Sequence, residues 1–252
     1  MPRHFIHYYF SDSLTENMTY ALSAIIKLYP DAYLLGSLGT ERMRGSDHHE
    51  RLRNADPIQL FGVSARHIFT NGSKCQLSYM LGMVSHYALD RVMNPYVKYF
   101  AANGVAGYFG GKIETQSMDE IEIGVDRHIV RDYLGMEKAL ALVDHLEVRK
   151  PVLEEICMLY VDVLNDVADI CMNYRKTYDL LESIKPDIPL SEGLGRLDFM
   201  NRENREWKGA QGTTSLSVDE LLKEQREVAY DLLEEYMAMA RSNKSINVEK
   251  FY

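Results

Sequence analysis

The chain has 252 residues, of which 46% are hydrophobic and 26% are charged, and its formal net charge is −9. This balance is typical of a globular protein, and the length suffices to bury a substantial core. The acidic excess argues against general nucleic-acid binding, because phosphate backbones are held by surfaces rich in lysine and arginine. We therefore expect no nucleic-acid partner.

Targeting signals are not evident in the sequence. No apolar run approaches the roughly 20 residues that span a bilayer, and residues 1–7 lack the basic head and apolar stretch of a signal peptide. We predict a cytoplasmic protein without a transmembrane segment. Cys75, Cys157 and Cys171 have no Cys-x-x-Cys spacing, so we predict reduced structural thiols, with Cys157 and Cys171 facing the core.

Helical periodicity covers most of the first half of the chain. A capping box at Ser13-Leu14-Thr15-Glu16 predicts that the first helix runs to about Leu28. Pro57 opens another helix, which Asn71-Gly72 ends near residue 70. Residues 73–99 are apolar at helical spacing, with Pro95 expected to kink or break the helix.

The second half continues the helical pattern after a glycine-rich connector at 104–111, which is predicted to be a flexible surface loop. Helices are expected over 117–134, 136–144 and, as the longest continuous one, 150–184. A second capping box, Ser217-Val218-Asp219-Glu220, starts a final helix to about residue 241. No strand pattern of useful length appears. The sequence thus predicts one all-α domain over 1–241, followed by a tail over 242–252.

The most informative motif is His86-Tyr87-Ala88-Leu89-Asp90, which places an imidazole and a carboxylate one helical turn apart in an apolar run. Such a pair suits a borderline cation such as zinc, although an isolated pair is more often a simple hydrogen bond on a helix. Further candidate ligands are grouped at three places: His4 and His7; Glu41 with Asp47-His48-His49-Glu50; and Glu114, Asp119, Glu120 and Glu122. His67, His128 and His145 have no partner at ligand spacing and are interpreted as structural.

The order of these segments resembles the zinc-dependent phospholipase C family, whose fold is shared with single-strand-specific nucleases. The central match is Leu81-Gly82 … His86-Tyr87-Ala88-Leu89-Asp90 … Asn94-Pro95-Tyr96. Weaker matches in the same order are Ile6-His7-Tyr8-Tyr9-Phe10, residues 34–41 ending in Gly39-Thr40-Glu41, His48-His49-Glu50, Ile121-Glu122 … Asp126-Arg127, and Trp207-Lys208 followed by residues 217–221.

The resemblance implies a compact helical domain whose cleft holds up to three zinc ions that activate water for attack on phosphorus. His7 would bind one ion. Glu41, His48 (or His49), His86 and Asp90 would bind another, with Asp90 able to bridge, and Glu122 would bind the last. Glu41 or Asp90 would orient or deprotonate the attacking water. The implied substrate is a small phosphate ester or a phospholipid head group.

The chain also departs from the family pattern. The family's Gly-Pro-Asp is Gly39-Thr40-Glu41 here, and two of its histidines fall on Asn94 and Met118. Neither side chain is a usual zinc ligand. We therefore expect fewer than three zinc ions, or none.

Three functions follow from these matches and departures. The first is a metal-dependent phosphoric-ester hydrolase. The second is an inactive binding or structural protein of the same fold, and a nuclease ranks last because the chain offers few basic or aromatic platforms. The long apolar helices and 17 tyrosines suit either a homo-oligomer surface or a core.

Overall fold

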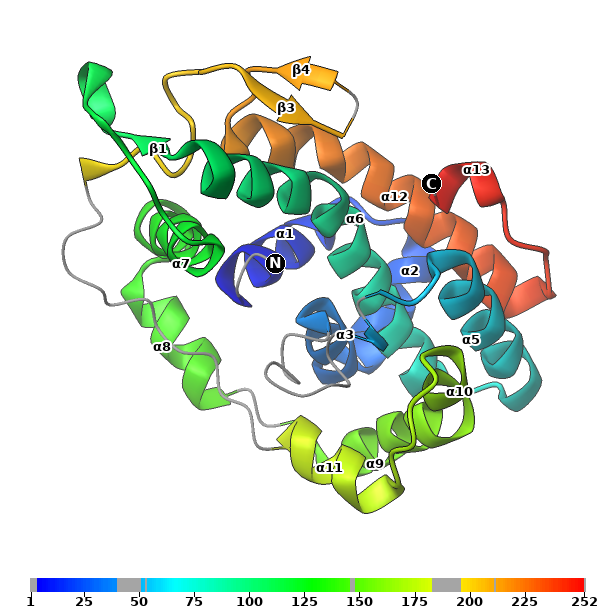
Figure 1. Ribbon diagram of the computed structural model, residues 1–252. Coiled ribbons are helices and arrows are strands. Elements are labelled where there is room, and N and C mark those ends of the chain that lie inside the picture. The colour runs from blue at the N-terminus through cyan, green and yellow to red at the C-terminus, as the bar shows by residue number, and fades with distance from the viewer. Residues whose placement is uncertain are drawn as a thin grey trace. The chain divides into compact units, whose positions relative to one another are not determined.

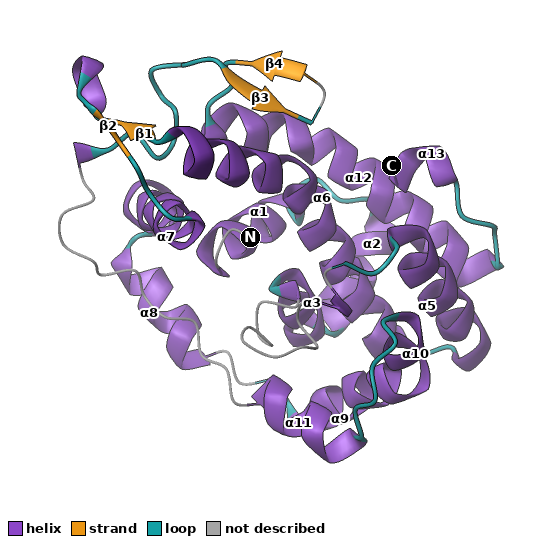
Figure 2. Cartoon of the chain, viewed as in Figure 1, coloured by secondary structure: helices purple, strands orange, loops and turns teal. Residues whose placement is uncertain are grey.

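The computed structural model describes residues 4–39, 51–52, 54–145, 148–182, 196–210 and 212–251 (Figure 1). The chain is mostly helical, as predicted, with two short pairs of strands (Figure 2). The predicted site residues Glu41, His48 and His49 lie outside the described residues.

The helices and strands have the following bounds. The helices are α1 His4–Leu14, α2 Tyr20–Leu28, α3 Pro30–Ser37, α5 Pro57–Asn71, α6 Lys74–Asn103, α7 Met118–Ile129, α8 Met136–His145, α9 Lys150–Leu159, α10 Asn165–Val167, α11 Tyr174–Glu182, α12 Val218–Ser242 and α13 Val248–Phe251. Two antiparallel pairs are formed by β1 Val105–Ala106 with β2 Ile113–Glu114, and by β3 Trp207–Gly209 with β4 Gly212–Thr214. π-helical turns follow α7 and α9, at Val130–Leu134 and Tyr160–Leu164.

The chain forms two compact units. The first comprises Met1–Phe10, Tyr87–His145 and Pro186–Val228; the second comprises Ser11–His86, Leu146–Lys185 and Ala229–Tyr252. In the first, the buried Tyr96 hydroxyl donates to the carbonyl oxygen of Phe199 at 2.7 Å, and the Trp207 ring packs edge-on against Tyr96. Helices α1, α6 and α12 contribute residues to both units.

Aromatic side chains also fill the core of the second unit. The hydroxyl groups of the buried Tyr79 and Tyr160 lie 2.7 Å apart. The ring of Phe61 lies 5.9 Å from that of Tyr236 and 5.2 Å from that of Phe251. Phe251 belongs to α13, so the predicted tail at 242–252 buries an aromatic side chain.

Several helix ends follow the sequence signals. The Asp56 side chain accepts the Ile58 N–H at 3.1 Å and so caps α5, which then begins at Pro57. Gly72, with φ of 71°, ends the same helix. The predicted capping box at residues 217–220 is confirmed: the Ser217 hydroxyl accepts the Glu220 N–H at 3.3 Å, and the Glu220 carboxylate accepts the Ser217 N–H at 2.8 Å.

The predicted first helix starts in the wrong place. Helix α1 begins at His4 and ends at Leu14, so the capping box expected at Ser13 does not form. Thr15 instead ends α1, because its N–H and its hydroxyl both donate to the carbonyl oxygen of Asp12, at 3.0 and 2.7 Å. As a result, His7 lies inside a helix rather than before one.

The predicted continuous helix over 150–184 is also wrong. After α10 the chain leaves the helical path at 168–173, where Asp169 has a φ of 51°. The Asn165 side chain stabilises this break by donating to the carbonyl oxygen of Met172 at 2.6 Å. Cys171 lies in the break and is exposed, contrary to its predicted core position, whereas Cys75 and Cys157 are buried; all three are free.

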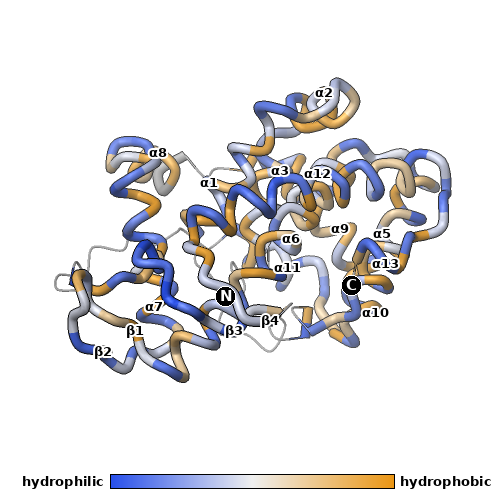
Figure 3. Tube along the Cα trace, turned by 90° about the horizontal axis from the view of Figure 1, so that it is seen from above, coloured by the Kyte–Doolittle hydropathy of each residue, from blue (hydrophilic) through white to orange (hydrophobic). Residues whose placement is uncertain are grey.

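Two other segments differ in part from expectation. Helix α6 continues through Pro95 to Asn103, so Pro95 does not break the helix. The predicted loop at 104–111 contributes β1 and a 3-10 turn at Tyr108–Gly110 to a hairpin that β2 completes. In the described part of the chain, none of the helices has the length and apolar character needed to cross a membrane. Helices such as α2 and α8 carry both hydrophobic and hydrophilic residues (Figure 3).

Candidate metal centre

Helix α6 supplies two of the candidate ligands. His86 and Asp90 lie four residues apart on this uninterrupted helix, so their side chains project from the same face one turn apart. Both side chains are buried, with 6% and 9% of the residue exposed. Burial of an imidazole and a carboxylate costs free energy unless their polar atoms have partners.

A close approach of helices α3 and α6 positions the end of α3 beside His86. A Cβ atom on Gly36 would lie 1.9 Å from the carbonyl oxygen of Tyr79, and one on Gly82 would lie 2.1 Å from that of Tyr33. Only glycine fits at both positions, because the two backbones are in direct contact there. The contact places the last residue of α3, Ser37, against the His86 ring.

The His86 imidazole is fixed on two sides. Its Nδ1 atom lies 3.1 Å from the carbonyl oxygen of Ser37. Because a carbonyl oxygen only accepts, Nδ1 carries the proton, and Nε2 of the neutral ring keeps the lone pair that a metal needs. Gly39, with φ of 56°, packs against the ring so closely that a Cβ there would lie 2.6 Å from the Nε2 atom.

The third candidate ligand, His7, comes from α1, and Asp126 on α7 holds the start of that helix. The Asp126 carboxylate accepts the N–H groups of Phe5 at 3.1 Å and Ile6 at 2.9 Å. These are two of the N–H groups that a helix cannot satisfy by itself, and a negative charge at this end also complements the helix dipole. Asp126 is 1% exposed, so a buried carboxylate fixes the backbone immediately before His7.

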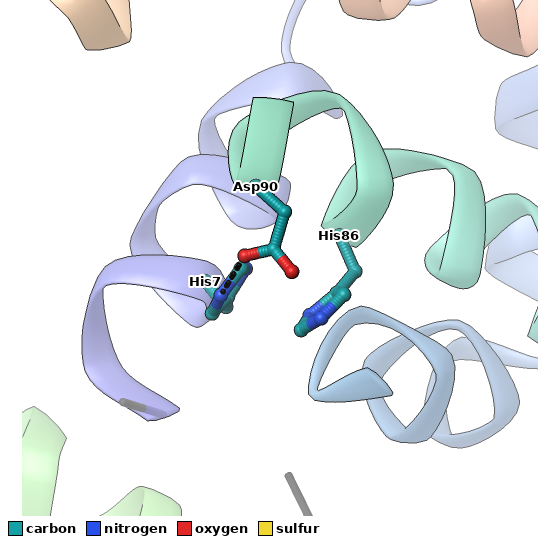
Figure 4. A group of neighbouring side chains, drawn as sticks. All are labelled: His7, His86 and Asp90. Carbon is teal, nitrogen blue, oxygen red and sulfur yellow. Dashed lines mark ion pairs between the residues drawn. The ribbon is translucent and has the colours of Figure 1, made fainter. Parts of the chain in front are cut away.

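The three side chains converge on one point (Figure 4). The His7 Nε2 atom lies 3.4 Å from Asp90 Oδ1. One ligand atom from each of His7, His86 and Asp90 lies within 4.8 Å of the other two. Within the described ranges this is the one group of three His, Cys, Asp or Glu residues that could hold a metal ion.

The donor set suits a divalent metal ion, and the separation between two ligand atoms of the cluster matches tetrahedral coordination. Zinc bonds of about 2.0–2.1 Å in a tetrahedral arrangement separate neighbouring ligand atoms by about 3.3 Å, and the separation between His7 and Asp90 is 3.4 Å. Two imidazole nitrogens and one carboxylate oxygen are typical zinc donors. The cluster can therefore hold one divalent ion.

The remaining predicted site residues are not part of this three-residue group. Glu122 is buried on α7, one turn before Asp126. Asn94 lies one turn after Asp90 on α6 and is partly exposed, and Met118 is 45% exposed at the start of α7. Among the other acidic candidates, Glu120 caps α7, and Glu114 forms an ion pair with Arg196 at 3.1 Å.

Two positioning groups were not predicted from the sequence, namely the Asp126 carboxylate and the Ser37 carbonyl. Asp126 follows Glu122 by one helical turn in an otherwise apolar stretch of α7, and this spacing is a signal that could have found it. A backbone carbonyl leaves no such signal, because every residue has one.

Comparison with protein-family models, curated proteins and solved structures gives no match to this chain.

Proposed function

We propose that this chain binds one zinc or related divalent ion at His7, His86 and Asp90 and hydrolyses a phosphoric ester there, in the manner of the zinc-dependent phospholipases C. The observation that carries the proposal is the convergence of three buried ligand atoms within 4.8 Å of one another. The hydrolytic step rests on the resemblance of the central motif and on the chemistry of the donor set.

The number and type of ligands favour a catalytic role over a structural one. Structural zinc sites are usually closed by four protein ligands, often cysteines, whereas catalytic sites keep three protein ligands and an open position. Among the described residues, the cluster has three ligands and no cysteine. This ligand set matches that of catalytic sites, in which a further position is taken by water or substrate.

The chain's own residues have distinct tasks in this proposal. His86 is held in one tautomer by Ser37, and His7 is held by the Asp126 cap on α1. Asp90 has one oxygen beside His7, and its carboxylate points between the two imidazoles (Figure 4), where it can orient a water molecule or accept its proton. A bound divalent ion supplies a Lewis acid and lowers the pKa of water.

A phosphate-bearing substrate needs positive charge at the site, and the chain as a whole carries −9. A divalent ion supplies that charge locally. Glu41, which follows Gly39 by two residues in the sequence, keeps its predicted role as an additional ligand or base. The proposed substrate class is a small phosphate ester or a phospholipid head group.

A second candidate function is metal binding without hydrolysis. It is favoured by the single three-ligand group of the described residues, because two-metal phosphoryl chemistry needs a second ion about 3.5–4 Å away. Asn94 and Met118, at positions where the family has histidines, point in the same direction.

Metal content tests the site directly. Wild-type protein and the variants His7→Ala, His86→Ala and Asp90→Asn would be purified without added metal, equilibrated with zinc, and analysed for bound metal by mass spectrometry. We expect about one bound ion in the wild type and a loss of bound metal in each variant. His67→Ala, which changes a histidine on α5 outside the cluster, serves as the matched control and should retain the metal.

Activity then separates the two candidate functions. Hydrolysis of bis(p-nitrophenyl) phosphate that needs zinc and disappears in His86→Ala and Asp90→Asn supports the hydrolase. Bound zinc without hydrolysis favours the second candidate. Wild-type protein that binds no zinc after equilibration contradicts both, and circular dichroism of each variant checks that the helices are retained.

A further inference from the structure

The hairpin of β1 and β2 presents apolar side chains to solvent. Phe109 is 99% exposed in the turn, and Ile113 at the start of β2 is 69% exposed. We call residues 108–113 the hairpin tip. The Phe109 ring lies 6.5 Å from the ring of its neighbour Tyr108 and is otherwise open to solvent. An aromatic ring this exposed is unusual, because burial of apolar surface is the main driving force of folding.

The exposed position of Phe109 is held by other residues. Its backbone has φ of 58° and ψ of 41°, a left-handed conformation that disfavours side chains with a Cβ. The Glu203 carboxylate accepts the Phe109 N–H. Arg205 donates both to Glu203 Oε2 at 2.6 Å and to the carbonyl oxygen of Gly107 at 3.0 Å. These contacts hold the tip in a conformation in which the Phe109 side chain is exposed rather than buried.

The small apolar area of the tip decides what can cover it. A stable protein interface buries about 800 Å² on each partner, whereas a fully buried aromatic side chain contributes only about 150–250 Å². The apolar area that Phe109 and Ile113 can bury together is therefore well below the area of a stable protein interface. A fluid hydrocarbon phase, by contrast, accepts single side chains, and each buried group contributes in proportion to its area.

The charge of the tip points to the same occupant. Lys112 lies between Phe109 and Ile113 in the sequence, is exposed, and forms no ion pair with any described residue. A lysine beside apolar side chains matches the phosphate layer that borders the hydrocarbon of a bilayer. We propose that the hairpin tip inserts into the surface of a phospholipid bilayer, with Phe109 and Ile113 in the apolar boundary and Lys112 at the phosphates.

This attachment is independent of the proposed metal centre, although it would suit a phospholipid substrate. One aromatic and one aliphatic side chain give a weak and reversible association, since even a single myristoyl chain binds membranes only marginally. We therefore expect partitioning at high lipid concentration rather than permanent anchoring. His86→Ala and Asp90→Asn should bind vesicles as the wild type does, so failure of the metal proposal leaves this one standing.

The test is co-sedimentation of the full chain with vesicles of phosphatidylcholine containing phosphatidylglycerol. The variant Phe109→Asn with Ile113→Thr removes the apolar groups and suits the backbone, because asparagine tolerates the left-handed conformation and threonine suits a strand. We expect its partition coefficient to fall by roughly tenfold or more. Tyr20→Ser, which removes an aromatic ring that is 89% exposed on α2, is the matched control and should bind like the wild type.

Fluorescence gives a second measurement on the intact protein. Trp207 is the only tryptophan and is 3% exposed, so its emission supplies a constant background. A Phe109→Trp variant should show a blue shift on addition of the same vesicles. Equal vesicle binding by wild type and the double variant overturns the proposal. The proposal is also overturned if the emission of the Phe109→Trp variant shifts to the blue with rising protein concentration in the absence of vesicles. A second copy of the chain would then cover the tip.

Discussion

The Nδ1 atom of His86 lies 3.1 Å from the carbonyl oxygen of Ser37, and this contact determines which ring nitrogen can bind a metal. With the proton on Nδ1, the Nε2 lone pair is directed away from α3 and is available to an ion. The contact depends on the close crossing of α3 and α6 at Gly36 and Gly82. The close packing of the α3 and α6 backbones thus fixes the orientation and the tautomer of the His86 ring.

Gly39→Ala should weaken metal binding although the substitution replaces none of the three ligands. The new Cβ would lie 2.6 Å from the His86 ring at a residue with φ of 56°, so the ring must move away from its present position. We expect a zinc affinity roughly 10–100-fold lower, the range for lost outer-shell partners, measured by competition with a chromophoric chelator. Gly72→Ala is the control, because its φ is 71° but nothing lies within 4 Å of its Cβ. Equal affinities in the two variants would contradict the role of Gly39.

Gly82→Ala should destabilise the fold by forcing α3 and α6 apart. Its Cβ would lie 2.1 Å from the Tyr33 carbonyl oxygen, a clash with backbone that side-chain rotation cannot relieve. We expect a loss of about 1–3 kcal/mol or more in the free energy of unfolding, measured by urea denaturation. Gly62→Ala, in α5 with nothing within 4 Å, should instead stabilise the protein by up to about 1 kcal/mol. A Gly82→Ala protein as stable as the wild type would show that the helices do not cross this closely.

Asp126→Ala should weaken metal binding through His7. The substitution leaves the N–H groups of Phe5 and Ile6 without their buried acceptor, which costs about 1–3 kcal/mol of stability. The start of α1 then loosens and His7 loses its fixed position, so the zinc affinity should fall as well. The control is Asp56→Ala, which removes the cap of α5 at a cost of about 1 kcal/mol and should leave zinc affinity unchanged. Loss of stability alone in Asp126→Ala would restrict Asp126 to a structural role.

The sequence was sufficient to predict the helical class and several helix ends, because periodicity and caps are local. Asp56 with Pro57, Gly72, and the box at Ser217 act through neighbours within a few residues. It failed where tertiary contacts set the boundary. Helix α1 starts at His4 because Asp126, about 120 residues away, caps it, and nothing in residues 1–20 reveals that partner.

The candidate site was predictable in part for the same reason. The His86 and Asp90 pair follows from helix geometry alone, whereas adding His7 required the resemblance, since no spacing rule links residues 7 and 90. Their proximity, with 3.4 Å between Nε2 and Oδ1, is a tertiary result. The exposed position of the Phe109 side chain was not predicted either, because it depends on Glu203 and Arg205, which lie about 95 residues further along the chain.

His128 should make stability depend on pH. It is 3% exposed, and burial, assisted by the Arg131 guanidinium that donates to its Nδ1 at 2.6 Å, lowers its pKa from 6.5 to about 4. The His128 ring is therefore neutral in the folded protein near neutral pH. In the unfolded chain the ring takes up a proton below about pH 6.5, so stability present above that pH is lost as the pH falls toward 4.

The loss attributable to His128 should approach about 2 kcal/mol between pH 7 and pH 5, at about 1.4 kcal/mol per pH unit below 6.5. Urea denaturation of the wild type and of His128→Gln at both pH values measures it. Glutamine keeps an acceptor for Arg131 but does not titrate, so the variant should lose less stability than the wild type over this range. If both proteins lose the same amount, the folded protein binds a proton at His128 as readily as the unfolded chain does, and the ring is not held neutral by its burial.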